Sequence, residues 1–142
     1  MGSQVSSIRL GRQYSMLFKN KTKQDASELL VSVTYEGKTV IIPRSKFTIG
    51  AKGFSDICID DGTVTRRHIQ VELTKSDFTI QDLGSDNGVY LLMVDGQKLG
   101  AQRLTNILHV NHSCTVHMGE PIILVELSFA PELGLFIFNF CK

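Results

Sequence analysis

The chain has 142 residues, of which 42% are hydrophobic and 20% are charged, and its formal net charge is +1. This length fits about one domain with a buried core, and the longest apolar runs fall well short of the roughly 20 residues that cross a bilayer. A net charge this small excludes a polycation that binds nucleic acid through its whole surface.

Residues 1–27 are polar and contain five basic residues and one acidic residue. We expect a flexible, basic N-terminal arm. It begins Met-Gly-Ser-Gln-Val-Ser, which fits the pattern for N-myristoylation with Gly2 as acceptor. One acyl chain binds membranes weakly and needs a second signal, which the basic residues could supply. The pattern thus predicts at most weak membrane association through the arm, with a tag remnant or a chance match as the alternatives.

From residue 28 to residue 130, short apolar runs alternate with Gly, Asp, Ser and Asn, which predicts one all-β domain. The expected strands cover residues 29–35, 39–42, 47–49, 56–59, 69–73, 78–83, 89–94, 114–117 and 121–129. They recur about every ten residues without a helical period, which is typical of a β-sandwich. Residues 131–142 form an apolar C-terminal extension, which we expect to add an edge strand; a partner-binding patch is the alternative.

Three polar loops lie between these strands: Gly50-Ala51-Lys52-Gly53, Thr65-Arg66-Arg67-His68 and Gly84-Ser85-Asp86-Asn87-Gly88. Loops on a rigid scaffold are where binding groups usually lie. Hydroxyl groups, backbone N–H groups and cations are what a phosphate group needs from a protein. The three loops therefore predict one anion-binding surface.

The same loops resemble the motifs of the forkhead-associated (FHA) domain family. The family pattern is Gly-Arg, then Ser-Arg-x-His or Ser-x-x-His, then Ser-x-Asn-Gly, set between short strands. Here Ile49-Gly50, Val64-Thr65-Arg66-Arg67-His68 and Ser85-Asp86-Asn87-Gly88 follow in that order. The resemblance covers about residues 29–129, although the stretch from 89 to 95 is a residue or two longer than in the family.

The resemblance implies an eleven-strand β-sandwich that binds phosphothreonine in partner proteins without catalysis and without a cofactor. Thr65 and Ser85 would donate hydroxyl groups to the phosphate, and Arg66 would supply a planar set of N–H groups. The other residues expected to bind the phosphopeptide are Lys52, Asp86 and Asn87. Gly50, His68 and Gly88 would hold the shape of the loops.

One position departs from the family pattern. Ala51 stands where the family has the arginine that grips the phosphate, and Lys52 is displaced by one position, so in an extended chain its side chain would point to the opposite face. A charge-assisted hydrogen bond contributes about 1.5–3 kcal/mol. Two hypotheses therefore stay open: Arg66 or Lys52 compensates, or the domain is a scaffold that binds partners independently of phosphorylation.

Other functional classes have little support. The odd number and wide spacing of Cys58, Cys114 and Cys141 indicate no disulfide framework and favour a reducing intracellular compartment, cytoplasmic or nuclear. A zinc site is conceivable, but its ligand types do not share one face of a strand: His109, His112, Cys114 and His117. No metal site is predicted. Catalytic motifs are absent, and the acidic body without Trp does not suit nucleic acid.

Overall fold

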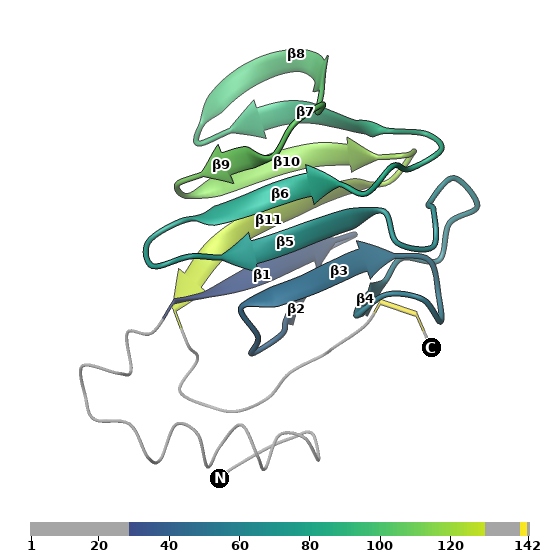
Figure 1. Ribbon diagram of the computed structural model, residues 1–142, viewed down its shortest axis with the longest axis horizontal. Helices are drawn as coiled ribbons and strands as arrows, with labels where there is room; N and C mark the ends of the chain where they lie inside the picture. The colour runs from purple at the N-terminus through teal and green to yellow at the C-terminus, as the bar shows by residue number, and fades with distance from the viewer. Residues whose placement is uncertain (1–28, 130–139, 142) are drawn as a thin grey trace, which may run out of the picture.

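The structure, a computed structural model, describes residues 29–129 and 140–141, in which eleven strands form two facing sheets (Figure 1). The larger sheet has the spatial order β2 (Lys38–Ile41), β1 (Leu29–Tyr35), β11 (Ile122–Phe129), β10 (Ser113–Met118), β7 (Val89–Val94) and β8 (Gln97–Arg103). The smaller sheet has the order β4 (Ile57–Cys58), β3 (Lys46–Gly50), β5 (Ile69–Leu73), β6 (Phe78–Asp82) and β9 (Leu108–Val110). The predicted all-β sandwich of about eleven strands is confirmed.

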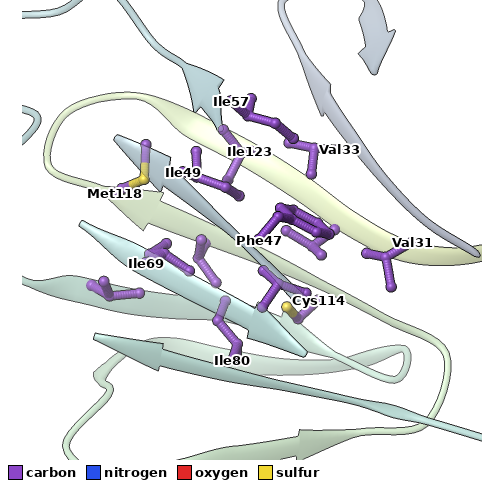
Figure 2. Close-up of a cluster of buried hydrophobic side chains, with 14 of the residues drawn as sticks. Val31, Val33, Phe47, Ile49, Ile57, Ile69, Ile80, Cys114, Met118 and Ile123 are labelled. Carbon is purple, nitrogen blue, oxygen red and sulfur yellow. The ribbon is translucent and has the colours of Figure 1, made fainter. Parts of the chain in front are cut away.

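The core lies between the two sheets and follows from the alternation of side chains along each strand. In β5, Ile69 and Val71 are fully buried, while Glu72 between the inward-facing positions is exposed. Side chains from both sheets interdigitate, among them Phe47 and Ile49 of β3 against Ile123 of β11 (Figure 2). Burying such a side chain stabilises the fold by about 1.5–3 kcal/mol, so the core holds the strand ends in fixed positions.

The predicted strands differ from the observed ones at three places. The run from Asp56 to Ile59 pairs only over Ile57–Cys58, where β4 lies parallel to β3. The strands β8 and β9 were not predicted, because the side chains of β8 are almost all exposed and show no alternation. β7 has one extra residue against β10, because the neighbours Thr115 and Val116 pair with Met93 and Leu91, which is a β-bulge.

The expectation that the cysteines form no disulfide is wrong. Cys58 in β4 is bonded to Cys141, with 5.6 Å between their Cα atoms, although 83 positions separate them in sequence. Next to this bond the ring of Phe140 packs edge-on against Tyr35, with 5.5 Å between the ring centroids. Disulfides persist in oxidising surroundings, so the cysteine pattern gives no support to a reducing compartment.

The part of the chain that the structure describes includes no helix that is long and apolar enough to cross a membrane. The arm over residues 1–27, with Gly2, and most of the extension over residues 131–142 lie outside the described residues. The flexible arm, acylation of Gly2, weak membrane association, an intracellular location and the added edge strand therefore stay predictions.

Asp95 joins the β7–β8 turn to the turn before β10. Its carboxylate accepts hydrogen bonds from the backbone N–H groups of Asn111 (3.0 Å), His112 (2.6 Å) and Ser113 (3.2 Å). Burial raises the pKa of Asp95, but these bonds, with the His112 side chain, outweigh it and hold the pKa below its usual value of 3.8. Asp95 also has a φ of 50° and Gly96 one of 83°, as hairpin turns of this kind require.

We expect Asp95→Asn to lower the free energy of unfolding by about 1.5 kcal/mol, because a neutral amide replaces the charged acceptor while Asn still tolerates a positive φ. Urea unfolding at pH 7 measures this loss, with Asp60→Asn at an exposed position as the control. A carboxylate with a lowered pKa stabilises the fold above pH 3.8 and ceases to do so as the pH falls further. The difference should therefore shrink near pH 3; a constant difference would contradict this account.

Candidate functional site

The three polar loops lie together at one end of the sandwich. β3 ends there at Gly50, β5 begins there at Ile69, β6 ends there at Asp82 and β7 begins there at Val89 (Figure 1, right). The cross-strand pairs Ile49–Ile69 and Ile69–Asp82 set this alignment. The sheets thus bring together segments that are distant in sequence.

The first two loops touch through their backbones at Gly50. The N–H of Ala51 donates to the carbonyl oxygens of Thr65 and Arg66, at 3.1 Å each, and the hydroxyl of Ser55 donates to Arg66 O at 2.6 Å. A Cβ at Gly50 would lie 2.2 Å from Arg66 O, closer than any real contact. Glycine is therefore needed at position 50 to let the two loops approach.

Hydrogen bonds join the second and third loops. The Thr65 hydroxyl accepts from the N–H of Asp86 at 2.9 Å, and the Asn87 side-chain amide donates to Thr63 O at 2.8 Å. Within the third loop, the Ser85 hydroxyl accepts from the N–H of Gly88 at 2.9 Å. Since each of these two hydroxyls already accepts from a backbone N–H, its own O–H is directed to other acceptors.

His68 holds the base of these loops. It is fully buried; its Nδ1 accepts from the N–H of Thr65 at 3.0 Å, and its Nε2 lies 2.9 Å from Gly88 O. An N–H can only donate, so Nδ1 is unprotonated and Nε2 carries the proton that it donates to Gly88. Burial lowers the pKa of His68 and outweighs the opposite effects of Gly88 O and the carboxylates of Asp82 and Asp86.

The cations of the site are exposed at its rim. The guanidinium of Arg66 lies over the ring of Phe54, 4.7 Å from its centroid. The guanidinium of Arg66 has no hydrogen bond or ion pair within residues 29–129 and 140–141, so its N–H groups are open to an anion. Lys52 and Arg67 are exposed, and neither forms an ion pair among the described residues. Arg67 lines a separate pocket described below, so Arg66 and Lys52 are the cations that the sequence predicts for the anion.

Arg103 lies on the other flank of the third loop. Its guanidinium lies 5.8 Å from the centroid of the Tyr90 ring and would be 3.5 Å from a Cβ at Gly88. Sequence analysis missed this residue, because β8 carries no recognisable pattern. It also missed Phe54 and Ser55; an aromatic residue inside a polar loop is the signal that could have indicated Phe54.

Lys52 does not lie in an extended chain, so the expectation that was based on one is wrong. The N–H of Phe54 donates to Ala51 O at 3.2 Å, so residues 51–54 form a turn. Strand alternation therefore does not decide the direction of the Lys52 side chain. The side chain of Ala51 itself is a methyl group beside Thr65 and Arg66, and it can donate nothing to an anion.

The four residues considered for zinc are not gathered into a site. No group of three or more metal-ligating side chains occurs within residues 29–129 and 140–141. Cys114 is buried in the core, and burial raises the pKa of its thiol to about 12, with Asp95 adding to the effect. A thiol that stays protonated is a poor metal ligand.

Comparison with known proteins agrees with this geometry. Residues 47–119, about half of the chain, match the family model of the FHA domain. The chain belongs to the FHA domain family. The match begins in β3 and ends just after β10, so it includes all three loops of the site.

Curated relatives of this FHA domain resemble it over a short stretch. It is 36% identical over 55 residues to the oxoglutarate dehydrogenase inhibitor of Corynebacterium glutamicum and to the glycogen accumulation regulator GarA of Mycobacterium tuberculosis. Each match covers 39% of this chain, 38% of the inhibitor and 34% of GarA. The matched part thus spans less than two fifths of either relative, both of which are named for regulatory roles.

Solved FHA structures share the fold. One, from a structural and functional study of phosphothreonine-dependent FHA domain interactions, has a TM-score of 0.57 and 18% identity, and the match covers 72% of this chain and 98% of that one. Mycobacterium tuberculosis EmbR, in complex with a low-affinity phosphopeptide, has a TM-score of 0.63 and 17% identity over 89% of this chain and 32% of EmbR. At such identities the likeness shows the fold alone.

Proposed function

We propose that this FHA domain binds phosphothreonine-containing segments of a partner protein at the three loops and performs no catalysis. The phosphopeptide would contact Lys52, Thr65, Arg66, Ser85, Asp86 and Asn87. Gly50, His68 and Gly88 would hold the loops in place. The main support comes from the hydroxyls of Thr65 and Ser85. Each already accepts a hydrogen bond from a backbone N–H, so each can donate its own O–H to a phosphate oxygen. Two hydroxyl donors, with the exposed Arg66 directly after Thr65 in the chain, suit a doubly charged group with three acceptor oxygens.

Asp86 and Asn87 contribute differently from the hydroxyls. The N–H of Asp86 is used by Thr65, and one N–H of the Asn87 amide is used by Thr63 O. The remaining polar atoms of the Asn87 amide can bond the backbone of a bound peptide. The exposed carboxylate of Asp86 would repel a phosphate, so the cations at positions 52 and 66 must outweigh it.

The alternative is a scaffold of the same fold that binds its partners independently of phosphorylation. Ala51 favours it, because its N–H contacts the Thr65 and Arg66 carbonyls while its side chain carries no charge. The two functions differ in one measurable quantity, which is the ratio of affinities for a phosphorylated peptide and its unphosphorylated twin.

We expect a phosphothreonine peptide to bind more tightly than its unphosphorylated twin, and Arg66→Ala to abolish the difference, because it removes the guanidinium from the loop that carries Thr65. Titration calorimetry with a phosphothreonine peptide library and its dephosphorylated control measures both. Lys75→Ala is the matched control, since it removes one charge between β5 and β6, at the opposite end of the sandwich. Equal affinities of the two peptides for the natural chain would favour the scaffold.

A further inference from the structure

A shallow pocket of about 380 Å³ lies beside the proposed phosphate site, on the side of β3. Its wall consists of Thr48, Gly53, Phe54, Ser55, Asp56 and Arg67. These residues come from β3, from the loop that follows it and from the loop before β5. The pocket is therefore built by two of the three loops that form the site.

Phe54 separates the pocket from the phosphate site. Its side chain is 52% exposed, Arg66 stacks on its ring, and the same residue lines the pocket together with Arg67. Arg66 thus lies on the side of the proposed phosphate site, and Arg67 lies in the pocket. Phe54 therefore links Arg66 to the wall of the pocket.

The acidic residue in the pocket wall, Asp56, already has hydrogen-bond donors for its carboxylate. The Asp56 carboxylate accepts from the N–H and the hydroxyl of Thr48, at 2.9 and 3.3 Å, and from the guanidinium of Arg44 at 2.9 Å. The Ser55 hydroxyl donates its proton to Arg66 O. Arg67, in contrast, has no acceptor among residues 29–129 and 140–141. The charge left unpaired in this pocket is positive.

We propose that this pocket binds an anionic side chain of the same phosphopeptide, held by Arg67 and packed along the ring of Phe54. This inference rests on the proposed function, since the phosphothreonine places the peptide. A carboxylate of Asp or Glu and a second phosphate share the required chemistry, because both accept two parallel N–H bonds from a guanidinium. The preferred partner segment is thus a phosphothreonine with an acidic or second phosphorylated residue nearby.

The test is a set of phosphothreonine peptides in which Glu, Gln or phosphoserine occupies each flanking position in turn. At one position we expect Glu or phosphoserine to bind roughly three- to tenfold more tightly than Gln, as one charge-assisted contact at an exposed site gives. Arg67→Gln should reduce this preference to less than about twofold and leave the preference for phosphothreonine over threonine unchanged. Arg67 forms no contact that the fold needs, and circular dichroism verifies folding.

The outcomes separate the two proposals. Lys75→Gln, the matched loss of charge at the far end, should keep the acidic preference. If the natural chain shows no acidic preference at any position, or if Arg67→Gln retains it, the pocket proposal is overturned while phosphothreonine binding stands. If no peptide distinguishes phosphothreonine from threonine, the proposed function itself fails. A preference for phosphoserine over Glu would assign the pocket to a second phosphate, and the reverse would assign it to a carboxylate.

Discussion

Ala51→Arg is expected to bind a phosphothreonine peptide about ten- to a hundredfold more tightly than the natural chain, and to bind the unphosphorylated twin no better. Position 51 lies beside Thr65 and Arg66, because its N–H donates to both of their carbonyl oxygens. An arginine there would add a charge-assisted bond worth about 1.5–3 kcal/mol, which corresponds to this factor.

The control for this variant is Ala51→Gln, which adds a long polar side chain without a charge. Calorimetry of both variants with both peptides separates the effect of charge from that of shape. If the arginine and glutamine variants bind the phosphopeptide equally, position 51 does not face the phosphate, and the absence of arginine in the natural chain has no bearing on its affinity.

His68→Leu is expected to lower the free energy of unfolding by about 3 kcal/mol. The substitution leaves the N–H of Thr65 and the carbonyl of Gly88 without the imidazole, and each buried unsatisfied group costs about 1–3 kcal/mol. The same change frees the loop that carries Thr65, so phosphopeptide affinity should fall as well. Urea unfolding measures the first effect, and calorimetry measures the second.

The pH dependence of the free energy of unfolding tests whether His68 is buried as a neutral imidazole. The pKa of His68 is lowered in the folded state, so between that value and the ordinary 6.5 the unfolded chain binds more protons. Stability is therefore fully present above about pH 6.5 and falls below it, by up to about 1.4 kcal/mol per pH unit. In His68→Leu, this fall in the free energy of unfolding below pH 6.5 should be missing. The variant His112→Gln, changed at an exposed histidine, should still show it. Identical slopes in all three proteins would contradict the assignment.

The sandwich could be predicted because its inner strands carry their own pattern. Ile69 to Leu73 alternates between buried and exposed positions, and the sequence displays this alternation directly. β8 could not be predicted, since nearly all of its residues face solvent and no alternation of apolar and polar residues marks it. The bond between Cys58 and Cys141 depends on the approach of segments 83 positions apart, which no local pattern encodes.

The site was predictable as far as its residues lie in motifs. Thr65, Ser85 and His68 belong to short patterns whose order along the chain is informative. The pocket beside Phe54 was not, because a hollow arises from the path of two loops rather than from residue types. The direction of the Lys52 side chain was not predictable either, because residues 51–54 form a turn and the alternation of a strand does not apply there.

The disulfide has a practical consequence for experiments on this domain. Cys141 is held against Cys58, and Cys58 pairs across the sheet with Gly50, where the first loop of the site begins (Figure 1). A fluorescent protein or affinity handle attached directly after Cys141 would start beside the candidate site and obstruct it. Buffers without thiol reagents keep the bond between Cys58 and Cys141 intact.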